Sequence, residues 1–496
     1  MLKNRINPGT NPNKLGWRII NILFSIVISV FILFYVSIRS YWPDLNGMLK
    51  VETGLSWNWA GILFISVLVI LVYSSILTYR LFFLKRNQFW LNKILTLLFT
   101  TIFSFWLIIL SLSDQLELIL FITTIDFYSP VLYSFLIIAL GLLLPRFIKL
   151  FKSYRKNTYS QKPRIVTLSM LLLYVATWFT PLIFVPTTVQ DIIPPKPIIL
   201  AHRGLTSLAP ENTLAAGELA SEMGADGWEV DIRMSADGKL FLMHDGNFIR
   251  TTNIANIFPT RKNDDISTFT LAEIRQLDAG SWFIDDDPYQ IFGFGKLNPL
   301  DYNKYRGLKI PTLEEVINLT KERDLILDLD LKSVSSNHPY FNNYDSILFA
   351  QLLSSGLDPK RILLRNNNEK AINMTRLIRH IGEGAIQESI VLDITAYLTN
   401  EQYINLHNDN IIIMAGVVNS PERFSQLWCL DMEYVLTDTP HLFTEMPKPN
   451  FHFTWNQYLM YWIIICLISL SIGIFFIKTL KNNSISSTKQ HSKRVN

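Results

Sequence analysis

The chain has 496 residues, of which 49% are hydrophobic, and a formal net charge of +4. This length allows two or three domains, and the hydrophobic fraction predicts membrane spans. The charge is unevenly distributed: residues 187–453 carry 23 basic and 36 acidic side chains, whereas the rest of the chain carries 22 and 5. An acidic central domain excludes nucleic acid as a partner. Cys429 and Cys466 match no metal motif, and Cys466 lies in an apolar run, so we expect no structural disulfide.

Apolar runs in the two flanks predict six transmembrane helices. A helix needs about 20 apolar residues to cross the roughly 30 Å hydrocarbon core. Such runs lie near residues 17–38, 60–84, 91–112, 127–147, 165–187 and 456–477. Asp126 and Pro130 interrupt the fourth run, so residues 114–126 are interpreted as interfacial or re-entrant. The predicted organisation is a membrane domain over 1–190 with five helices, a single helix over 455–478, and a basic tail over 479–496.

The basic residues predict an orientation for these spans. Of the 22 basic residues in the flanks, 20 precede the first span, fill the second and fourth connections, or follow the last span. Short loops rich in Lys and Arg stay in the cytoplasm. We therefore expect a multi-pass protein of the cell membrane with both termini cytoplasmic and the central domain extracellular.

The central domain, residues 194–453, alternates short apolar runs with helical patterns. Eight strands are expected, at 197–202, 227–232, 239–244, 325–331, 361–365, 389–393, 410–417 and 434–438. Helices are expected over Thr213–Met223, Leu313–Glu322 and Asn367–Ile381. Eight strands in about 255 residues predict an α/β fold, a (β/α)₈ TIM barrel inserted between the fifth and sixth spans. An open doubly wound sheet is the alternative, but its Gly-x-Gly-x-x-Gly turn is absent from the sequence.

Polar residues occupy the positions where such a barrel carries its chemistry. His202 and His244 each end an apolar run, while Glu229 and Asp231 share one face of a predicted strand. Asp330 lies on the inward face of another strand, and Asp328 shares that face, so spacing does not choose between them. Buried carboxylates are costly without partners. Three of them therefore predict a hard divalent cation, Mg²⁺ or Ca²⁺, with oxygen ligands.

Taken singly, each of these features has an ordinary structural explanation. A lone histidine at a strand end is more often a hydrogen-bonding residue, and a single Glu-x-Asp is usually a solvated face. Their conjunction at the ends of several strands is what favours a site.

Six motifs resemble the glycerophosphodiester phosphodiesterase family, in the family's order across 198–445. They are AHRG at 201–204, PENT at 210–213, WEVDIRMSADGKLFLMHD at 228–245, IPTLEE at 310–315, DLK at 330–332 and LTDTP at 436–440. The resemblance implies a metal-dependent barrel enzyme that hydrolyses glycerophosphodiesters to glycerol 3-phosphate and an alcohol. It implies His202 and His244 as the acid–base pair, Glu229, Asp231 and Asp330 as metal ligands, and Arg203 and Lys332 as phosphate contacts.

Three places depart from the family's pattern or vary within it. Asp330 stands where the family usually has Glu, which is one methylene longer. Gly-Val-Val-Asn at 416–419 replaces the usual Trp-Thr-Val-Asn, so that wall of the pocket is altered. Residues 283–306, rich in Phe, Tyr and Asp, resemble the family's variable insertion, which is expected to cover the pocket and influence the choice of leaving group.

The predicted function is a membrane-anchored phosphodiesterase acting at the outer surface, with membrane lipid around it. The resemblance implies that the 2-hydroxyl of the substrate glycerol attacks phosphorus, giving a cyclic phosphate that water then opens. Polyglycerolphosphate teichoic acid and lysophospholipids are alternative substrates. A sensor or transporter with a barrel that only binds ligand is a hypothesis of another class, although the spans carry almost no ionisable residue except Asp126.

Overall fold

The computed structural model describes residues 12–37, 42, 46, 57–82, 92–101, 123–138, 140–141, 162–289, 291–292, 298–365, 376–380, 390–395, 400–408 and 412–492. The chain divides into two compact units. Residues 1–122, 196–424 and 431–447 form the first, and residues 123–195, 425–430 and 448–496 form the second.

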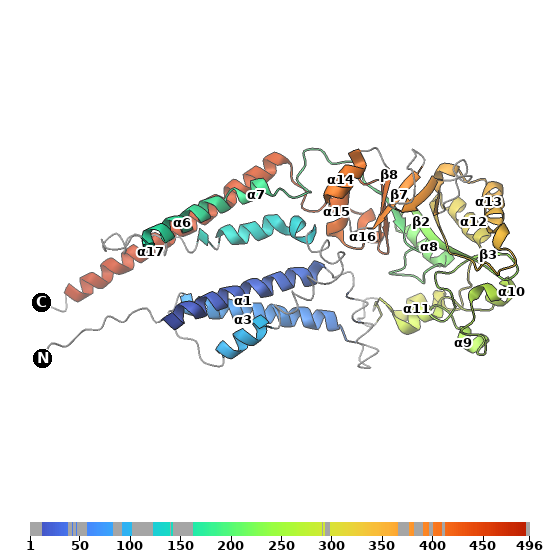
Figure 1. The fold of residues 1–496 in the computed structure, drawn as a ribbon, viewed down its shortest axis with the longest axis horizontal. Helices are drawn as coiled ribbons and strands as arrows, with labels where there is room; N and C mark the ends of the chain where they lie inside the picture. Colours follow the sequence, from blue (N-terminus) through green and yellow to red (C-terminus); the bar gives the residue numbers. More distant parts are fainter. Residues whose placement is uncertain are drawn as a thin grey trace. The chain divides into compact units, whose positions relative to one another are not determined.

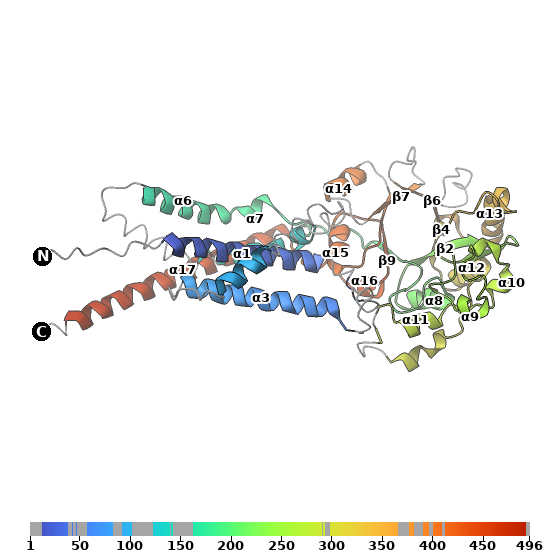
Figure 2. The same cartoon turned by 60° about the horizontal axis from the view of Figure 1, so that its bottom comes forward.

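A closed parallel barrel forms the core of the central domain (Figures 1 and 2). Its eight strands are β1 (Ile198–Ala201), β2 (Gly227–Met234), β4 (Ile326–Leu331), β5 (Ile362–Arg365), β6 (Arg376–His380), β7 (Ile390–Thr395), β8 (Ile412–Gly416) and β9 (Tyr434–Thr437). Each strand pairs in parallel with its neighbours, and β1 pairs with both β9 and β2, which closes the circle. The predicted TIM-barrel-like architecture is confirmed.

Two of the predicted elements are wrong. The run ending at His244 forms β3 (Leu240–Leu242), which pairs antiparallel with β2 and is not a barrel strand. Only residues 235–239 join β2 to β3, whereas a parallel crossover needs a dozen or more residues. The eighth barrel strand is β6, which lies at the end of the segment predicted as the helix Asn367–Ile381. Pairing with β5 and β7 gives residues 376–380 their strand conformation; residues 366–375 lie outside the described residues.

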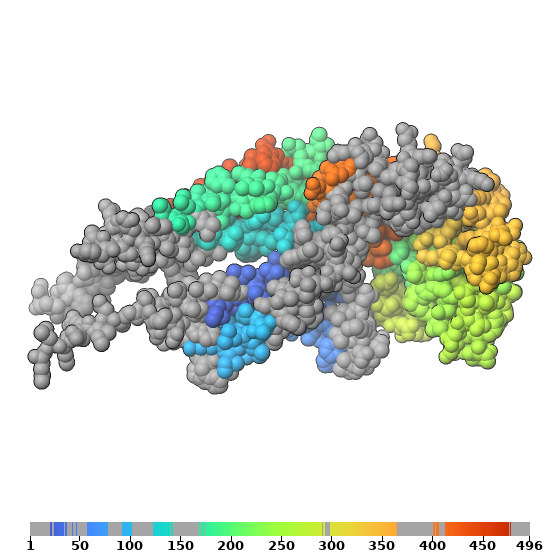
Figure 3. Space-filling view, in the orientation of Figure 1, coloured from blue at the N-terminus to red at the C-terminus, as the bar shows by residue number. Residues whose placement is uncertain are grey.

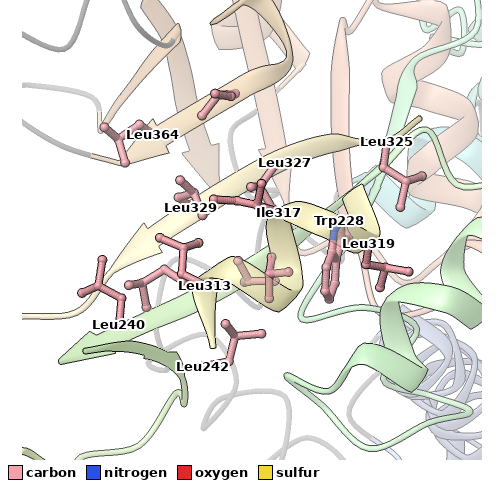
Figure 4. Packing of buried hydrophobic residues seen from close by; sticks show 14 of the residues in the cluster. Trp228, Leu240, Leu242, Leu313, Ile317, Leu319, Leu325, Leu327, Leu329 and Leu364 are labelled. Carbon is pink, nitrogen blue, oxygen red and sulfur yellow. The ribbon is translucent and has the colours of Figure 1, made fainter. Parts of the chain in front are cut away.

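The strand alternation separates an apolar layer from a polar one. Trp228, Val230 and Ile232 on β2 face outward and pack with Leu327 and Leu329 of β4 in one buried cluster (Figure 4). Two helices, α8 (Leu214–Glu222) and α12 (Leu313–Glu322), contribute to the same cluster. Because successive strand side chains alternate, Glu229, Asp231 and Asp330 face the opposite way, into the barrel. The helix α13 (Tyr344–Ser355) packs on the outer apolar cluster through Leu348 and Leu352, and its opposite face lies at the surface of the domain (Figure 3).

Shorter elements connect the strands of the barrel domain. They are α9 (Ile254–Ile257), η2 (Ile266–Thr268), α10 (Leu271–Ile274), α11 (Ser281–Asp286), η3 (Pro299–Tyr305), η4 (Phe341–Asn343), η5 (Pro359–Arg361), α14 (Asn400–Asn408), α15 (Pro421–Cys429) and α16 (His441–Thr444).

The flanking segments are helical where the structure describes them. The helices are α1 (Pro12–Ser37), α3 (Trp59–Phe82), residues 92–101, Thr123–Ile138, α6 (Lys162–Thr177), α7 (Thr180–Ile183) and α17 (Trp455–Ser492). Within the described part of the chain, two stretches are long and apolar enough to cross a membrane, Trp59–Leu77 and Trp455–Phe475. The fourth predicted span begins four residues earlier, at Thr123, and the expected tail from 479 continues α17 as helix to Ser492. Residues 102–112 and 142–147 of the predicted spans lie outside the described residues, and the count of six stays a prediction.

Hydrogen bonds between hydroxyl groups join helices of the second unit. The Tyr174 hydroxyl of α6 hydrogen-bonds with the Ser469 hydroxyl of α17 at 2.7 Å, and Ser134 does the same with Tyr461 at 2.6 Å. Cys429 and Cys466 are both free thiols.

Candidate active site

Three carboxylates meet inside the barrel, near the carboxyl ends of its strands. Glu229 and Asp231 lie on β2 and Asp330 lies on β4, with one oxygen of each within 4.8 Å of the others. The register places Asp231 beside Asp330. Asp328 is fully buried and lies beside Glu229, nearer the amino end of β4. Asp330, and not Asp328, is therefore the third member of the carboxylate cluster.

Two cationic side chains balance this negative charge. The Lys332 ammonium lies 2.7 Å from one oxygen of Asp231 and 2.6 Å from Asp330. Arg203 Nε lies 3.1 Å from Asp231, an ion-pair distance without the alignment of a hydrogen bond. Burial raises the pKa of Asp231, but Arg203 and Lys332 outweigh it and keep this pKa below its usual range. Asp231 is therefore ionised at neutral pH.

The PENT motif holds the acidic cluster in place. The Asn212 amide donates to Asp231 at 2.7 Å and accepts from the backbone N–H of Asp231 at 3.1 Å. Thr213, the next residue, accepts from Ala216 N and caps the amino end of α8. The backbone N–H of Arg203 donates to Glu229 at 2.9 Å. These contacts fix the orientation of the two carboxylates on β2.

His202 follows β1 and is held by a partly buried carboxylate after β9. Its Nδ1 lies 2.7 Å from Asp438 Oδ1, and its Nε2 lies 4.0 Å from Glu229. Asn419 clamps Asp438 by donating to Oδ2 at 2.6 Å and accepting from the Asp438 backbone N–H at 2.9 Å. Burial lowers the pKa of His202, but Asp438 outweighs burial and raises it above its ordinary value.

His244 reaches the same edge of the barrel through β3. The hairpin runs back along β2, so that the backbone N–H of Met243 donates to the carbonyl of Asp231 at 3.0 Å. His244 Nδ1 lies 2.8 Å from Asp245, and the His244 carbonyl accepts from Arg233 at 2.6 Å. Although burial raises the pKa of Asp245, its bonds from Arg250 and His244 lower it to about 2.

A chain of ion pairs links this second histidine pair to the acidic cluster. Arg250 donates to both Asp245 and Glu211 through two bonds each, all at 2.7–3.0 Å. Glu211 in turn accepts from Arg203 at 3.2 Å, and Arg203 contacts Asp231. The two imidazoles therefore belong to one connected polar network at the ends of β1 and β2, which are neighbours.

Both histidines present the same ring nitrogen for chemistry. An ionised carboxylate only accepts hydrogen bonds, so Nδ1 of each ring donates to its aspartate. The neutral imidazole then carries its lone pair on Nε2, which is the atom able to take up and release a proton. The structure thus brings together all seven residues predicted from the sequence: His202, Arg203, Glu229, Asp231, His244, Asp330 and Lys332.

Several residues of the site have no role assigned from the sequence. In the sequence, Asp438 is only the last residue of a predicted strand, and Asn419 is only part of the Gly-Val-Val-Asn run that alters the pocket wall. Glu211 stands in the PENT motif, and its contact with Arg250 joins residues 39 apart. His202 and Asp438 both end predicted strands, and this shared position is the one sequence signal that could have paired them. Nothing in the sequence around Arg250 distinguishes it from a surface arginine.

The fold and the site define an α/β barrel protein with a candidate acid–base and metal centre at the carboxyl ends of its strands. Residues 202–399 match the model of the Glycerophosphoryl diester phosphodiesterase family. For these residues the match confirms the glycerophosphodiester phosphodiesterase family that the motifs predict.

Relatives named as phosphodiesterases or as phosphodiesterase-domain proteins share this similarity. Mouse (Mus musculus) glycerophosphoinositol inositolphosphodiesterase GDPD2 is 32% identical over 64% of this chain and 62% of its own length. Chicken (Gallus gallus) glycerophosphodiester phosphodiesterase domain-containing protein 5 is 28% identical over 89% of this chain and 74% of its own. The chain thus spans less than two thirds of the mouse relative.

One solved structure that is similar to this chain is that of an Oleispira antarctica phosphodiesterase in complex with the product sn-glycerol-3-phosphate. It is 24% identical and covers 50% of this chain and 95% of its own, with a TM-score of 0.39.

Proposed function

We propose that this protein is a membrane-anchored glycerophosphodiester phosphodiesterase. One observation carries the proposal: in a domain that matches this family, two histidine–aspartate pairs and three carboxylates meet at the carboxyl ends of the barrel strands. Active sites of such barrels lie at that face. The reaction would release glycerol 3-phosphate and an alcohol.

The two histidines divide the proton transfers that a phosphodiester needs. Nε2 of one histidine takes the proton from the 2-hydroxyl of the substrate glycerol, whose oxygen forms a new bond to phosphorus. The bond from phosphorus to the leaving alcohol breaks, and the second histidine gives that oxygen a proton. Water then opens the cyclic phosphate by the reverse transfers. Such general acid–base catalysis contributes typically about 10²- to 10⁴-fold.

The acidic cluster fits a divalent cation. Its ligands are hard carboxylate oxygens, which Mg²⁺ and Ca²⁺ prefer, and the ionised state of Asp231 suits them. Glu229, Asp231 and Asp330 would hold the ion, which would offset negative charge on the phosphoryl oxygens. Lys332 and Arg203 already lie on this cluster and are placed to add positive charge beside the phosphate.

The location of the reaction is also part of the proposal. The apolar stretches Trp59–Leu77 and Trp455–Phe475 lie on either side of the barrel domain in the sequence and support a membrane protein. The excess of basic residues in the flanks supports an orientation with the barrel outside the cell and both termini in the cytoplasm. Substrates would then be diesters of the outer membrane surface or the extracellular medium.

A substrate panel tests the activity. The full-length protein in detergent would be offered glycerophosphocholine, glycerophosphoinositol, a lysophospholipid and polyglycerolphosphate, with Mg²⁺ or Ca²⁺, and glycerol 3-phosphate release would be followed. Glycerophosphoinositol is included because the mouse relative is named for it. We expect turnover of at least one small diester. Binding of these compounds without turnover under both metals would instead support a ligand-binding barrel.

A further inference from the structure

His244 stands on a more exposed part of the fold than His202. It follows β3, which lies outside the closed barrel, and 36% of its side chain is exposed, against 19% for His202. Asp245, which accepts from its Nδ1, is the next residue in the chain. Because the two residues belong to one short segment, their hydrogen bond alone does not fix the imidazole relative to the barrel. A third group from elsewhere in the fold is needed for that.

Arg250 connects this segment to the PENT motif. Its guanidinium donates two bonds to Asp245, at 2.7 and 3.0 Å, and two bonds to Glu211, both at 2.7 Å. Four of its five N–H groups are thereby used, and both oxygens of each carboxylate accept. Because the guanidinium is planar and its N–H groups form a rigid fork, these bonds set the orientation of both carboxylates.

Glu211 is the fixed end of this connection. Only 9% of its side chain is exposed, and it also accepts from Nη1 of Arg203 at 3.2 Å. The next residue, Asn212, is hydrogen-bonded to Asp231 in both directions. Arg250 therefore ties the carboxylate beside His244 to the same motif that orients the acidic cluster.

The bonds of Arg250 favour a holding role over contact with substrate. Arginine commonly binds a phosphate through two parallel N–H groups, and Arg250 has one N–H group beyond the four that its carboxylates use. Two-point binding of a phosphate would therefore break one of its bonds to Asp245 or Glu211.

We propose that Arg250 is a positioning residue for His244, acting through Asp245 and anchored by Glu211. This inference rests on the proposed function, because it assigns His244 a proton-transfer role. Arg250 holds Asp245 against the PENT motif, and Asp245 accepts from Nδ1 of His244. The direction of that bond sets the direction in which Nε2 points, so Arg250 fixes the reactive nitrogen without touching the substrate.

Arg250→Ala with chemical rescue tests the proposal. Loss of a hydrogen bond between charged groups corresponds to roughly a 10- to 100-fold fall in rate. We expect the full-length variant to lose kcat by about that factor, with KM within about twofold of wild type. Since 44% of the Arg250 side chain is exposed, added guanidinium can enter the vacated space and should restore part of kcat. Urea, which has the same shape but no charge, should not.

Arg275 provides the matched control for loss of a paired arginine. It makes two bonds to Glu315, at 2.8 and 3.0 Å, and 37% of its side chain is exposed. Neither Glu315 nor its other hydrogen-bond acceptor, the carbonyl of Ile310, belongs to the site. Arg275→Ala should therefore leave kcat unchanged, and guanidinium should not raise it.

Two further variants separate the geometry of the fork from its charge. Arg250→Lys keeps the positive charge, but one ammonium cannot bond both oxygens of two carboxylates, so kcat should stay well below wild type. Glu211→Gln should also lower kcat. Arg250→Ala combined with Glu211→Gln should lose less than the product of the two single losses, because the residues act together. Wild-type kcat in Arg250→Lys, or losses that multiply, would overturn the proposal.

A readout without substrate separates this proposal from the proposed function. In protein labelled with ¹⁵N-histidine, Arg250→Ala should shift the Nδ1–H signal of His244, assigned with His244→Ala, and guanidinium should move it back. Arg275→Ala should leave the signal in place. If the wild type hydrolyses nothing, the proposed function fails, and this shift still decides the role of Arg250.

Two results with Arg250→Ala would count against the positioning role. An unmoved His244 signal or an unchanged kcat would overturn it. A rise in KM alone would make Arg250 a substrate contact instead.

Discussion

His202 and His244 have the same kind of partner but differ in how firmly it is held. Asp438 is clamped by Asn419 and Thr206, both uncharged, so within the described part of the chain His202 is its only hydrogen-bond partner that can carry a positive charge. Asp245 instead shares its oxygens between His244 and the permanent cation of Arg250. The two imidazoles therefore meet different electrostatic surroundings within one site.

Removal of either imidazole is expected to abolish most turnover. His202→Ala and His244→Ala should each lower kcat by about 10²- to 10⁴-fold, because each removes one proton transfer. His441→Ala is the control, since that half-buried ring lies near Glu445 and not among the site residues. Circular dichroism should show all three variants folded. More than about half of wild-type activity in either site variant would show that the histidine is not part of the acid–base pair.

Metal dependence should follow the geometry of the cluster. Activity is expected to disappear in EDTA and return with a divalent cation. Asp330→Asn should raise the metal concentration for half-maximal activity by tenfold or more, because it removes the charge of one ligand. Asp328→Asn should raise it less, since Asp328 lies beside Glu229 and outside the three-carboxylate cluster.

The reverse ranking of these two variants would move the third ligand to Asp328. Asp330→Glu provides a further comparison, because it restores the longer side chain usual in the family. We expect this variant to bind metal at concentrations close to those of the wild type.

The site residues with a sequence motif could be predicted, and their partners could not. His202, Glu229, Asp231 and His244 stand at strand ends or share a strand face, which alternation reveals, whereas alternation leaves Asp328 and Asp330 as alternatives. Asp438, by contrast, is 236 residues from the histidine it holds. Its role depends on β9 closing against β1, a long-range pairing that local pattern does not encode.

At the scale of elements, the hairpin of β2 and β3 delivers His244. Its turn is stabilised by the backbone N–H of Lys239 donating to Ser235 Oγ at 2.9 Å and by Gly238 N donating to Ser235 O at 2.8 Å. Gly238 has φ +72°, and a Cβ there would lie 3.0 Å from the Tyr340 ring. Glycine is required at this position for both reasons.

Gly238→Ala is therefore expected to destabilise the domain. A left-handed backbone costs a non-glycine residue roughly 1–2 kcal/mol, before any displacement of Tyr340. Urea unfolding in detergent would measure the loss. Gly246→Ala is the matched control, because its φ is not in the left-handed range and no atom lies within 4 Å of its added Cβ. Equal stability of the two variants would contradict the strain assigned to Gly238.

The sequence predicts eight barrel strands, and the barrel has eight, but one predicted strand is replaced by another: β3 lies outside the barrel and β6 takes its place. The apolar run before His244 has the composition of a barrel strand, but a five-residue connection permits only antiparallel pairing. The sequence RLIRH of β6 carries two arginines and a histidine and has none of the apolar continuity expected of a buried parallel strand. Its conformation comes from its neighbours, which single-sequence patterns do not contain.

At the scale of the whole molecule, the basic flanks predict which side of the membrane holds the barrel. Ser335 is exposed on the barrel domain, and Ser153 lies in the basic fourth connection. Ser335→Cys should react with a membrane-impermeant maleimide on intact cells, and Ser153→Cys only after permeabilisation. The wild-type chain, with Cys429 buried and Cys466 in the last span, gives the background. If only Ser153→Cys is labelled on intact cells, the orientation is the reverse of the one proposed, and the substrate is cytoplasmic.

The closure of the barrel by β1 and β9 also has a consequence during protein synthesis. His202 is translated 236 residues before Asp438, its partner directly after the last barrel strand. At roughly 5–20 residues per second, about 10–50 s pass between the two. Throughout that interval the first histidine lacks its carboxylate and the barrel lacks its closing strand. A ribosome-stalled chain that ends before Thr437 is therefore expected to be inactive, so the growing chain cannot act on diesters until the barrel has closed.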